Sequence, residues 1–349
     1  MLFQLQLLLT SLASALVLHP RSTSQQTIPY EGHVITQFPK PTWIENIAVR
    51  KNGHLLLTLA SIADLYTIDP LRPNSTQTLI HNFAPDTALL GITEVGPDQF
   101  FLIAGNFSLA TFNPGIGSYS VWSVDLRKYN EKSNNGAIIN QLATIPKASF
   151  LNGMSTLDVP QNLVVLADSL LGVVWLLNTH TGVSSILLQE PEMAPPSNST
   201  SFPVGINGLR VLPLAGKDFA YVYFDNSDAA AFYRVPVSLS TLKKIGPVEL
   251  LAEGIGADDF ALDAESGYAY LAAGEINEIV RVPLEGGATG VTVFGGLNST
   301  ALPGPTSLVL GRGERERGAI YVTTNGALLK PVNGTFSEGG KVVAIDLGC

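Results

Sequence analysis

Short apolar runs separated by Gly, Pro and Asn recur along the whole chain, and the clearest repeated unit spans residues 43–58. In this unit a short apolar strand begins near Glu45, a turn follows at Asn52 and Gly53, and a second apolar strand continues from there. An Asn-Gly pair between two apolar runs predicts a β-hairpin in which both turn residues adopt positive φ. The pattern therefore predicts two antiparallel strands with a carboxylate at the start of the first.

The same unit returns five more times, and the residues equivalent to Glu45 are separated by 45, 62, 55, 51 and 48 residues. This spacing is typical of a β-propeller, in which each four-stranded blade takes roughly 40 to 50 residues before loop insertions. The sequence therefore predicts an all-β fold, a six-bladed β-propeller. We call the six equivalent residues the first ring: Glu45, Leu90, Asn152, Asn207, Asp258 and Thr306. Further strands are expected at residues 100–104, 163–167, 220–224, 268–272 and 319–323.

A propeller must close its ring of blades, and an apolar segment at residues 32–38 stands before the first repeat. We expect this segment to pair with residues 341–346, so that an N-terminal strand completes the last blade. No linker or charge run divides the chain, and we expect one domain at residues 19–349.

The N-terminal residues 1–18 read as a secretory signal peptide, with cleavage expected at about residues 15–20. Five Asn-x-Ser/Thr sequons agree with N-glycosylation in a secretory pathway; they begin at Asn74, Asn106, Asn198, Asn298 and Asn333. Cys349 is the only cysteine, which excludes an intramolecular disulfide.

Charged residues make up only 14% of the chain and hydrophobic residues 46%, as expected for a body of buried strands. The net charge of −9 argues against nucleic acid, because such binding demands clustered Lys and Arg. We expect a monomer without a stable membrane span.

The innermost strands of a propeller all run in the same direction, so the first-ring residues should meet at one end of the central channel. Four of them carry side-chain oxygen donors: Glu45, Asn152, Asn207 and Asp258. Two carboxylates and two amides are the donors that a hard cation such as Ca²⁺ prefers, whereas zinc would require nitrogen or sulfur ligands. The alternatives are that each Asn-Gly pair is a turn and that the acidic residues lie at solvated strand ends.

The order of Glu45, the two Asn-Gly pairs and Asp258 followed by Asp263 on a six-bladed frame resembles the SMP-30/gluconolactonase-like propellers. The resemblance implies that one divalent ion is held by Glu45, Asn152, Asn207 and Asp258. In a narrower comparison, the signal peptide, residues 42–58, and the later Leu-Asn-Gly-Met and Ala-Asp-Asp-Phe motifs are similar to a fungal group of secretory-pathway propellers. That group includes the hetero-Diels-Alderases of tropolone sesquiterpenoid biosynthesis.

This narrower resemblance implies an enzyme that joins a quinone-methide-type diene to a terpene alkene, takes a small apolar natural product and requires no cofactor. Loss of water to form the diene would need an acid, and neighbouring carboxyls among apolar walls have raised pKa values. We expect Asp258, Asp259 and Glu45 to be the catalytic residues. The residues expected to bind substrate are Trp43, Phe150, Phe202, Phe260, Asn152, Asn207 and Thr306.

Two other classes remain open. A calcium-dependent lactone hydrolase would need the ion and a base that activates water, and none of the histidines is well placed for that role. A noncatalytic binding propeller would need exposed aromatic or charged residues on a flat face. The aromatic residues near the first ring could also serve only to pack one blade against the next.

Overall fold

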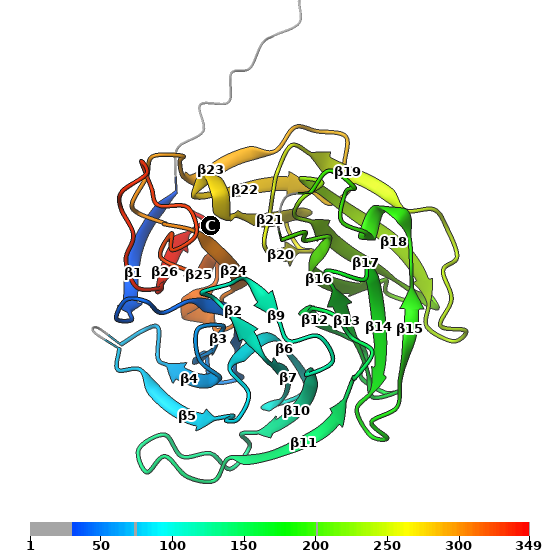
Figure 1. The fold of residues 1–349 in the computed structure, drawn as a ribbon, viewed down its shortest axis with the longest axis horizontal. Coiled ribbons are helices and arrows are strands. Elements are labelled where there is room, and N and C mark those ends of the chain that lie inside the picture. The colour runs from blue at the N-terminus through cyan, green and yellow to red at the C-terminus, as the bar shows by residue number, and fades with distance from the viewer. Residues whose placement is uncertain (1–29, 73–74, 200–201, 349) are drawn as a thin grey trace, which may run out of the picture.

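Six four-stranded antiparallel sheets stand around a common axis in the computed structural model, which describes residues 30–72, 75–199 and 202–348 (Figure 1). This is the predicted six-bladed β-propeller. The expected signal peptide lies outside the described residues. Blade 1 consists, from inner to outer strand, of β2 (Ile44–Val49), β3 (Leu55–Leu59), β4 (Asp64–Ile68) and β5 (Thr78–Asn82). Blade 2 consists of β6 (Ala88–Gly96), β7 (Gln99–Gly105), β10 (Ser120–Asp125) and β11 (Ile138–Thr144). Blade 3 consists of β12 (Leu151–Asp158), β13 (Leu163–Asp168), β14 (Val173–Asn178) and β15 (Ser184–Leu188).

The other three blades follow the same order around the axis. Blade 4 consists of β16 (Ile206–Pro213), β17 (Phe219–Asn226), β18 (Ala231–Ser238) and β19 (Glu249–Glu253). Blade 5 consists of β20 (Phe260–Asp263), β21 (Tyr268–Ala273), β22 (Glu278–Pro283) and β23 (Val291–Gly295). Blade 6 consists of β24 (Pro305–Leu310), β25 (Ala319–Thr324), β26 (Lys341–Asp346) and β1 (Glu31–Gln37). The N-terminal strand β1 is thus the outer strand of blade 6, with Val34 opposite Val343, and the predicted closure is confirmed.

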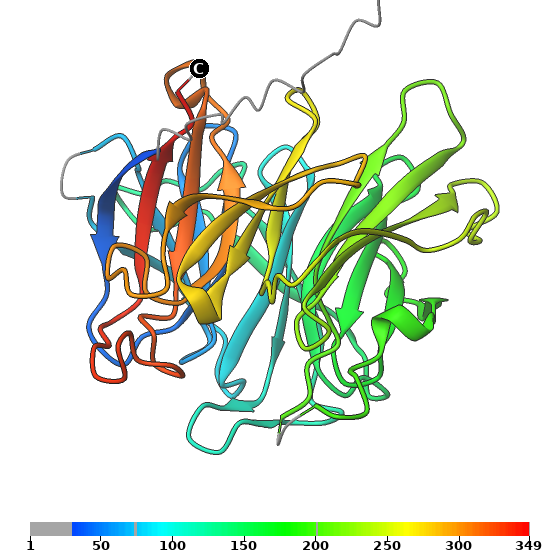
Figure 2. The ribbon, with the colours of Figure 1, turned by 90° about the horizontal axis from the view of Figure 1, so that it is seen from above.

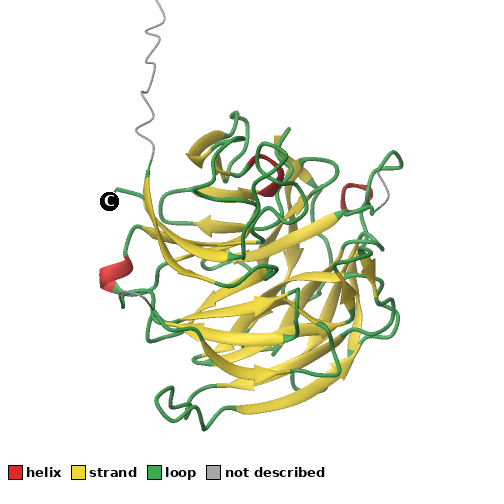
Figure 3. Ribbon diagram, turned by 60° about the vertical axis from the view of Figure 1, so that its left-hand side comes forward, coloured by secondary structure: helices red, strands yellow, loops and turns green. Residues whose placement is uncertain are grey.

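Strands make up nearly all of the regular structure (Figure 3). Outside the blades lie a small hairpin of β8 (Phe107–Ser108) and β9 (Asn113–Pro114) and three 3₁₀ turns, η1 (Pro191–Met193), η2 (Gly274–Ile276) and η3 (Glu314–Glu316). Among the described residues, no helix has the length and apolar character needed to cross a membrane.

The blades are held together by apolar side chains packed between neighbouring sheets. Six buried clusters are present, one at each interface between adjacent blades. In the perpendicular view the strands run between the two ends of the molecule (Figure 2). We call the end at which the innermost strands begin the mouth of the channel. The loops there include the β8–β9 hairpin and the segment between β15 and β16.

The first hairpin differs in detail from its prediction. Gly53 has a φ of 87°, but Asn52 does not have positive φ. The Gly53 amide donates to the carbonyl of Arg50, and the Arg50 amide donates to the carbonyl of His54. This is a longer loop with a single left-handed residue at its end, which is the other common way to join two twisted strands. The expectation that both turn residues adopt positive φ was therefore wrong.

Most innermost strands change register at the first-ring position. The shift lies between Ile44 and Asn46 in β2 and between Leu151 and Met154 in β12, and strands β6, β16 and β24 have the same irregularity. A bulge of this kind places two residues opposite one on the partner strand and redirects their side chains. The residue after each first-ring position therefore also approaches the axis. We call these residues the second ring: Asn46, Gly91, Gly153, Gly208, Asp259 and Ser307.

Candidate functional site

The two rings border one narrow polar space on the axis. Its lining comes from five blades and consists of Glu45, Asn46, Asn152, Gly153, Asn207, Gly208, Asp258, Asp259 and Thr306. The structure thus brings together the oxygen-bearing first-ring residues that the sequence singled out. The space does not admit a water-sized sphere, so an organic ligand would have to bind at the mouth, above the first ring. Asn152 and Asn207 lie within strands β12 and β16, which rules out the alternative that each Asn-Gly pair is a turn.

Asn207 fixes one side of the first ring. Its Nδ2 donates to Asp258 Oδ1 at 2.6 Å and to Ser227 Oγ at 3.0 Å, while Ser227 Oγ donates to the carbonyl of Ala257 at 2.7 Å. The Thr306 hydroxyl, in contrast, donates to the carbonyl of Ile44 at 2.6 Å. Thr306 therefore lines the space, and its hydroxyl hydrogen bond links blade 6 to blade 1.

Two first-ring carboxyls have raised pKa values. Burial, followed by the negative charge of Asp258, raises the pKa of Glu45 well above its usual value. Burial deep in the channel raises the pKa of Asp258 to about 7, although the hydrogen bond from Asn207 works in the opposite direction. Near neutral pH, Asp258 can therefore hold a proton and also release it, which is the property required of a general acid.

The adjacent carboxylate, Asp259, belongs to the second ring and has different surroundings. Asp259 Oδ2 accepts hydrogen bonds from Asn46 Nδ2 at 3.0 Å, Ser307 Oγ at 2.6 Å and Arg210 Nη2 at 2.6 Å. Its Oδ1 accepts from the backbone N–H of Phe260 at 2.8 Å. Charged and neutral donors from blades 4, 5, 6 and 1 thus converge on a single side chain.

The second ring contains three glycines, Gly91, Gly153 and Gly208, on consecutive blades 2 to 4, and we call them the glycine half of the second ring. The backbone of neighbouring blades packs directly against them. A Cβ atom on Gly153 would lie 2.6 Å from the carbonyl oxygen of Asn207, and one on Gly91 would lie 2.5 Å from that of Asn152. A Cβ on Gly208 would collide with Asp259 and lie 2.7 Å from Asp225 Oδ1. Glycine is required here because backbone passes where a side chain would begin.

Asp225, Arg210 and Asn46 are parts of this site that the sequence analysis missed. Asp225 is fully buried, and its Oδ1 has no hydrogen-bond partner among the described residues. Burial and the nearby charges of Asp259 and Asp258 raise its pKa well above the usual value. Nothing in the local sequence distinguishes Asp225 from an ordinary strand-end aspartate, because its role depends on contacts between blades.

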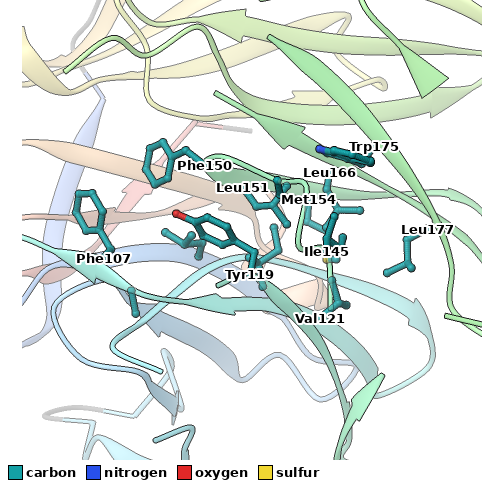
Figure 4. Packing of buried hydrophobic residues seen from close by; sticks show 14 of the residues in the cluster. Phe107, Tyr119, Val121, Ile145, Phe150, Leu151, Met154, Leu166, Trp175 and Leu177 are labelled. Carbon is teal, nitrogen blue, oxygen red and sulfur yellow. The ribbon is translucent and has the colours of Figure 1, made fainter. Parts of the chain in front are cut away.

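Aromatic side chains pack together in the buried cluster between blades 2 and 3, where Phe107, Tyr119 and Phe150 lie near one another (Figure 4). Phe107 and Phe150 are stacked with ring centroids 5.5 Å apart, and Phe202 lies 5.4 Å from Phe150. Phe112, from the β8–β9 hairpin, packs on both Phe107 and Phe202. Phe107 and Phe112 were not foreseen from the sequence. Trp43, Phe107 and Phe150 are buried in the cluster between blades, whereas Phe112 and Phe202 are only partly buried.

Phe260 lies elsewhere. Its ring is fully buried in the cluster between blades 4 and 5, where it meets Phe232 edge-on at 4.8 Å and lies beneath the Arg210 guanidinium. In this structure Phe260 therefore packs one blade against the next and does not reach the mouth.

A calcium ion is implied by the resemblance of the fold, and the first ring offers oxygen donors of the right type. The arrangement does not fit such a site, because Asn207 directs its Nδ2, rather than its carbonyl oxygen, to Asp258. In the described part of the chain, no group of three or more His, Cys, Asp and Glu side chains is placed to hold a metal. Calcium binding therefore stays a prediction.

Comparison with known proteins finds two relatives that match most of the chain. No family model matches the chain. A protein from Phoma sp is 24% identical over 318 residues, covering 86% of this chain and 88% of its own length, and one from Sarocladium schorii is 25% identical over 338 residues, covering 86% and 80%. Both carry the name "Putative hetero-Diels-Alderase", the second with the designation asR5. The chain resembles hetero-Diels-Alderases.

Solved structures with a similar fold are found at low sequence identity. The crystal structure of regucalcin from Agrobacterium tumefaciens, a calcium-binding protein, matches with a TM-score of 0.60 at 13% identity. The match covers 91% of this chain and 95% of that one. At this level of identity the likeness concerns the fold alone.

Proposed function

We propose that this protein is a hetero-Diels-Alderase-like cyclase that joins a quinone-methide-type diene to a terpene alkene at the mouth of the channel. The observation that carries the proposal is the position of Asp258, a carboxyl with a pKa of about 7 that lines the axial space together with the other oxygen-bearing first-ring residues. The similarity to two proteins of that name over 86% of the chain supports the same function. The partly buried Phe112 and Phe202 would supply the apolar surface against which two apolar partners are oriented.

The first chemical step would be loss of water from a hydroxybenzyl-type alcohol. Protonated Asp258 gives its proton to the leaving hydroxyl, the carbon–oxygen bond breaks, and water departs. The ring hydroxyl of the same molecule then loses its proton to the Asp258 carboxylate, which leaves a neutral quinone methide and restores the acid.

The second step is the cycloaddition, in which the carbonyl oxygen and the exocyclic carbon of the diene each form one bond to the alkene. All atoms are retained and no proton moves. Little charge has to be stabilised, so the enzyme contributes mainly by holding both partners in reactive contact away from water. The second-ring residue Asp259 would support this site by fixing the floor beneath the first ring.

A calcium-dependent lactone hydrolase is the second candidate, because the four oxygen-bearing first-ring residues and the regucalcin-like fold favour it. A lactonase would require Glu45 and Asp258 to be ionised in order to bind the ion. The cyclase requires Asp258 to carry a proton. One residue cannot meet both requirements at the same pH, so the two functions can be separated by experiment.

The test is to incubate the purified protein with an ortho-hydroxybenzyl alcohol and a cyclic sesquiterpene alkene, and to compare the stereoisomer ratio of the adduct with a no-enzyme control. Trp43→Ala should reduce the rate or the stereoselectivity while uncatalysed product persists. Phe219→Ala, at the start of β17 and therefore at the opposite end of the propeller, should change neither. Unchanged stereochemistry in Trp43→Ala, together with lactone hydrolysis that Asp258→Asn abolishes, would favour the lactonase instead.

A further inference from the structure

The Asn207 amide has a nitrogen end and an oxygen end, and a neighbouring hydroxyl decides which of them faces Asp258. Ser227 Oγ donates to the carbonyl oxygen of Ala257 at 2.7 Å and lies 3.0 Å from Asn207 Nδ2. Its other neighbour, Asp225 Oδ2, is farther away at 3.5 Å. A hydroxyl has one proton and a carbonyl oxygen can only accept, so the Ser227 proton is committed to Ala257. Ser227 therefore offers Asn207 a lone pair, to which only the nitrogen end of the amide can bond.

The same nitrogen also bonds to the first-ring carboxyl. Asn207 Nδ2 donates its second hydrogen to Asp258 Oδ1 at 2.6 Å. If the amide turned over, its oxygen would face the Ser227 lone pair on one side and the Asp258 carboxyl on the other. The bond to Ser227 would then be lost, because neither oxygen has a hydrogen to give to the other.

Blade 3 contains an equivalent pair of residues without this contact. Ser227 directly follows β17 in blade 4, and Ser169 directly follows β13 in blade 3. Each serine amide donates to the carbonyl of the residue two positions before the first-ring Asn of its own blade, at 3.2 Å and 2.8 Å respectively. Ser169 Oγ, however, is buried and has no hydrogen-bond partner among the described residues. The hydroxyl therefore orients the first-ring amide in blade 4 and not in blade 3.

We propose that Ser227 is a positioning residue that holds Asn207 with its nitrogen toward Asp258 and thereby keeps divalent cations out of the first ring. Ca²⁺ needs oxygen ligands, and Asn207 directs an N–H to the place where the ion would need an oxygen. The axial space does not admit a water-sized sphere. It can still be wide enough for the ion, because Ca²⁺–oxygen distances of about 2.3–2.6 Å are shorter than the ~2.7–2.8 Å between hydrogen-bonded oxygens. The inference does not depend on which reaction takes place at the mouth.

Calcium binding in matched variants tests this assignment. Thermal unfolding at pH 8 should be followed over a series of CaCl₂ concentrations, because a ligand that binds only the folded state raises the melting temperature according to its dissociation constant. In Ser227→Ala the amide can turn its oxygen to the ion without losing the bond to the hydroxyl. The Ca²⁺ affinity should therefore rise about 2- to 13-fold, which corresponds to one net hydrogen bond of about 0.5–1.5 kcal/mol. Ser227→Thr, which keeps the hydroxyl, and Ser169→Ala, which removes an unbonded one, should both bind Ca²⁺ as the wild type does.

The Asn207→Asp background separates orientation of the amide from any other effect of Ser227. A carboxylate presents an oxygen whichever way it turns, so a hydroxyl cannot select its orientation. Adding Ser227→Ala to Asn207→Asp should therefore leave the Ca²⁺ affinity of Asn207→Asp unchanged, as a double-mutant cycle would show. Equal affinity of Ser227→Ala and the wild type, or the same gain in both backgrounds, would overturn the proposal.

A measurement on the wild type covers the case in which the variants do not fold. Both hydrogens of Asn207 Nδ2 are bonded, so both of its side-chain amide signals in the NMR spectrum of ¹⁵N-labelled protein should exchange slowly in deuterium oxide. Fast exchange of either signal would also overturn the proposal. None of these experiments needs turnover, so failure of the cyclase assay alongside the expected calcium result would refute the proposed function and leave the assignment of Ser227 standing.

Discussion

Asp258 and Asp259 are consecutive in the chain and lie in the same channel, yet they meet different neighbours. Asp258 in the first ring accepts one short hydrogen bond, from Asn207, and its pKa rises to about 7. Asp259 in the second ring accepts from Asn46, Ser307 and Arg210 and from a backbone N–H. The first ring thus leaves a carboxyl with unused bonding capacity facing the mouth, whereas the second ring uses its carboxylate to join four blades.

Two consecutive residues at the start of an innermost strand can therefore differ in role: Asp258 is placed to react, and Asp259 is placed to hold neighbouring blades together. Just before β20, the Asp258 amide donates to the carbonyl of Ala272 and the Ala272 amide donates to the carbonyl of Asp259, so both residues lie opposite one residue of β21 and both reach the axis. If the two rings have these roles, substitutions in the second ring should act on stability and substitutions in the first ring should act on chemistry.

The largest effect on stability is expected for Asp259→Ala. Removing this carboxylate leaves the Arg210 guanidinium without its charged partner and takes the acceptor from Asn46 and Ser307. Breaking a buried ion pair by deleting one partner costs about 3–5 kcal/mol of the free energy of unfolding. Chemical denaturation monitored by circular dichroism measures this, with Asp346→Ala at an exposed strand end as the control. A loss below about 1 kcal/mol would show that Asp259 does not join the blades.

The complementary variant is Asp258→Asn, which should abolish chemistry while the fold remains. An amide of the same shape cannot act as an acid, and loss of a general acid lowers the rate by about 10²- to 10⁴-fold. Stability should not fall, because replacing a buried carboxyl by a neutral group removes the cost of ionising it. Single-turnover kinetics and the melting temperature should be compared on one preparation. Full activity in Asp258→Asn would refute its role as the acid.

The sequence predicted those features that depend on position along the chain. The repeat spacing fixed the blade number, and residues at the start of an innermost strand meet at the axis in any propeller, so Glu45, Asn152, Asn207 and Asp258 were found. Arg210, Asn46 and Asp225 were missed because their roles depend on contacts across blade interfaces, which strand bulges determine.

Phe260 is a residue that the sequence analysis placed wrongly. Its closeness in sequence to Asp258 suggested a place at the mouth, but successive residues of a strand point to opposite faces. A shift of one or two residues therefore separates a channel residue from one packed between blades, and Phe260 lies in the buried cluster with Phe232. Chain distance alone cannot make that distinction.

A smaller loss of stability is expected for Gly208→Ala. The added Cβ would meet Asp259 and lie 2.7 Å from Asp225 Oδ1, both held by the surrounding blades. Overpacking of this kind costs about 1–3 kcal/mol in the free energy of unfolding. The matched control is Gly256→Ala, where the nearest atom to a Cβ is the Ser227 carbonyl oxygen at 3.4 Å. Equal stability of the two variants would show that the glycine half of the second ring is not tightly packed.

The first ring should also produce a pH dependence of stability. The folded-state pKa of Asp258 is about 7, above its ordinary value, so the protonated form stabilises the fold. That contribution is fully present below the unfolded pKa of about 3.9 and is lost as the pH rises through about 7. The melting temperature should therefore decline between about pH 4 and pH 7, less steeply in Asp258→Asn, and kcat/KM should decline above pH 7 in the wild type. Identical melting profiles for the two proteins would contradict the raised pKa.

The smallest effect is expected from removal of calcium, and it separates the two candidate functions. A ligand that binds only the folded state raises the melting temperature, so a resident ion would be revealed by a drop on chelation. Because Asn207 directs its Nδ2 to Asp258, and burial raises the pKa values of Glu45 and Asp258, we expect EDTA to leave melting and cyclase activity unchanged at pH 6. At pH 8, where Asp258 is ionised, added calcium should have its greatest chance to bind. A clear stabilisation there that Asp258→Ala abolishes, accompanied by lactone hydrolysis, would replace the acid assignment of the first ring with a metal site.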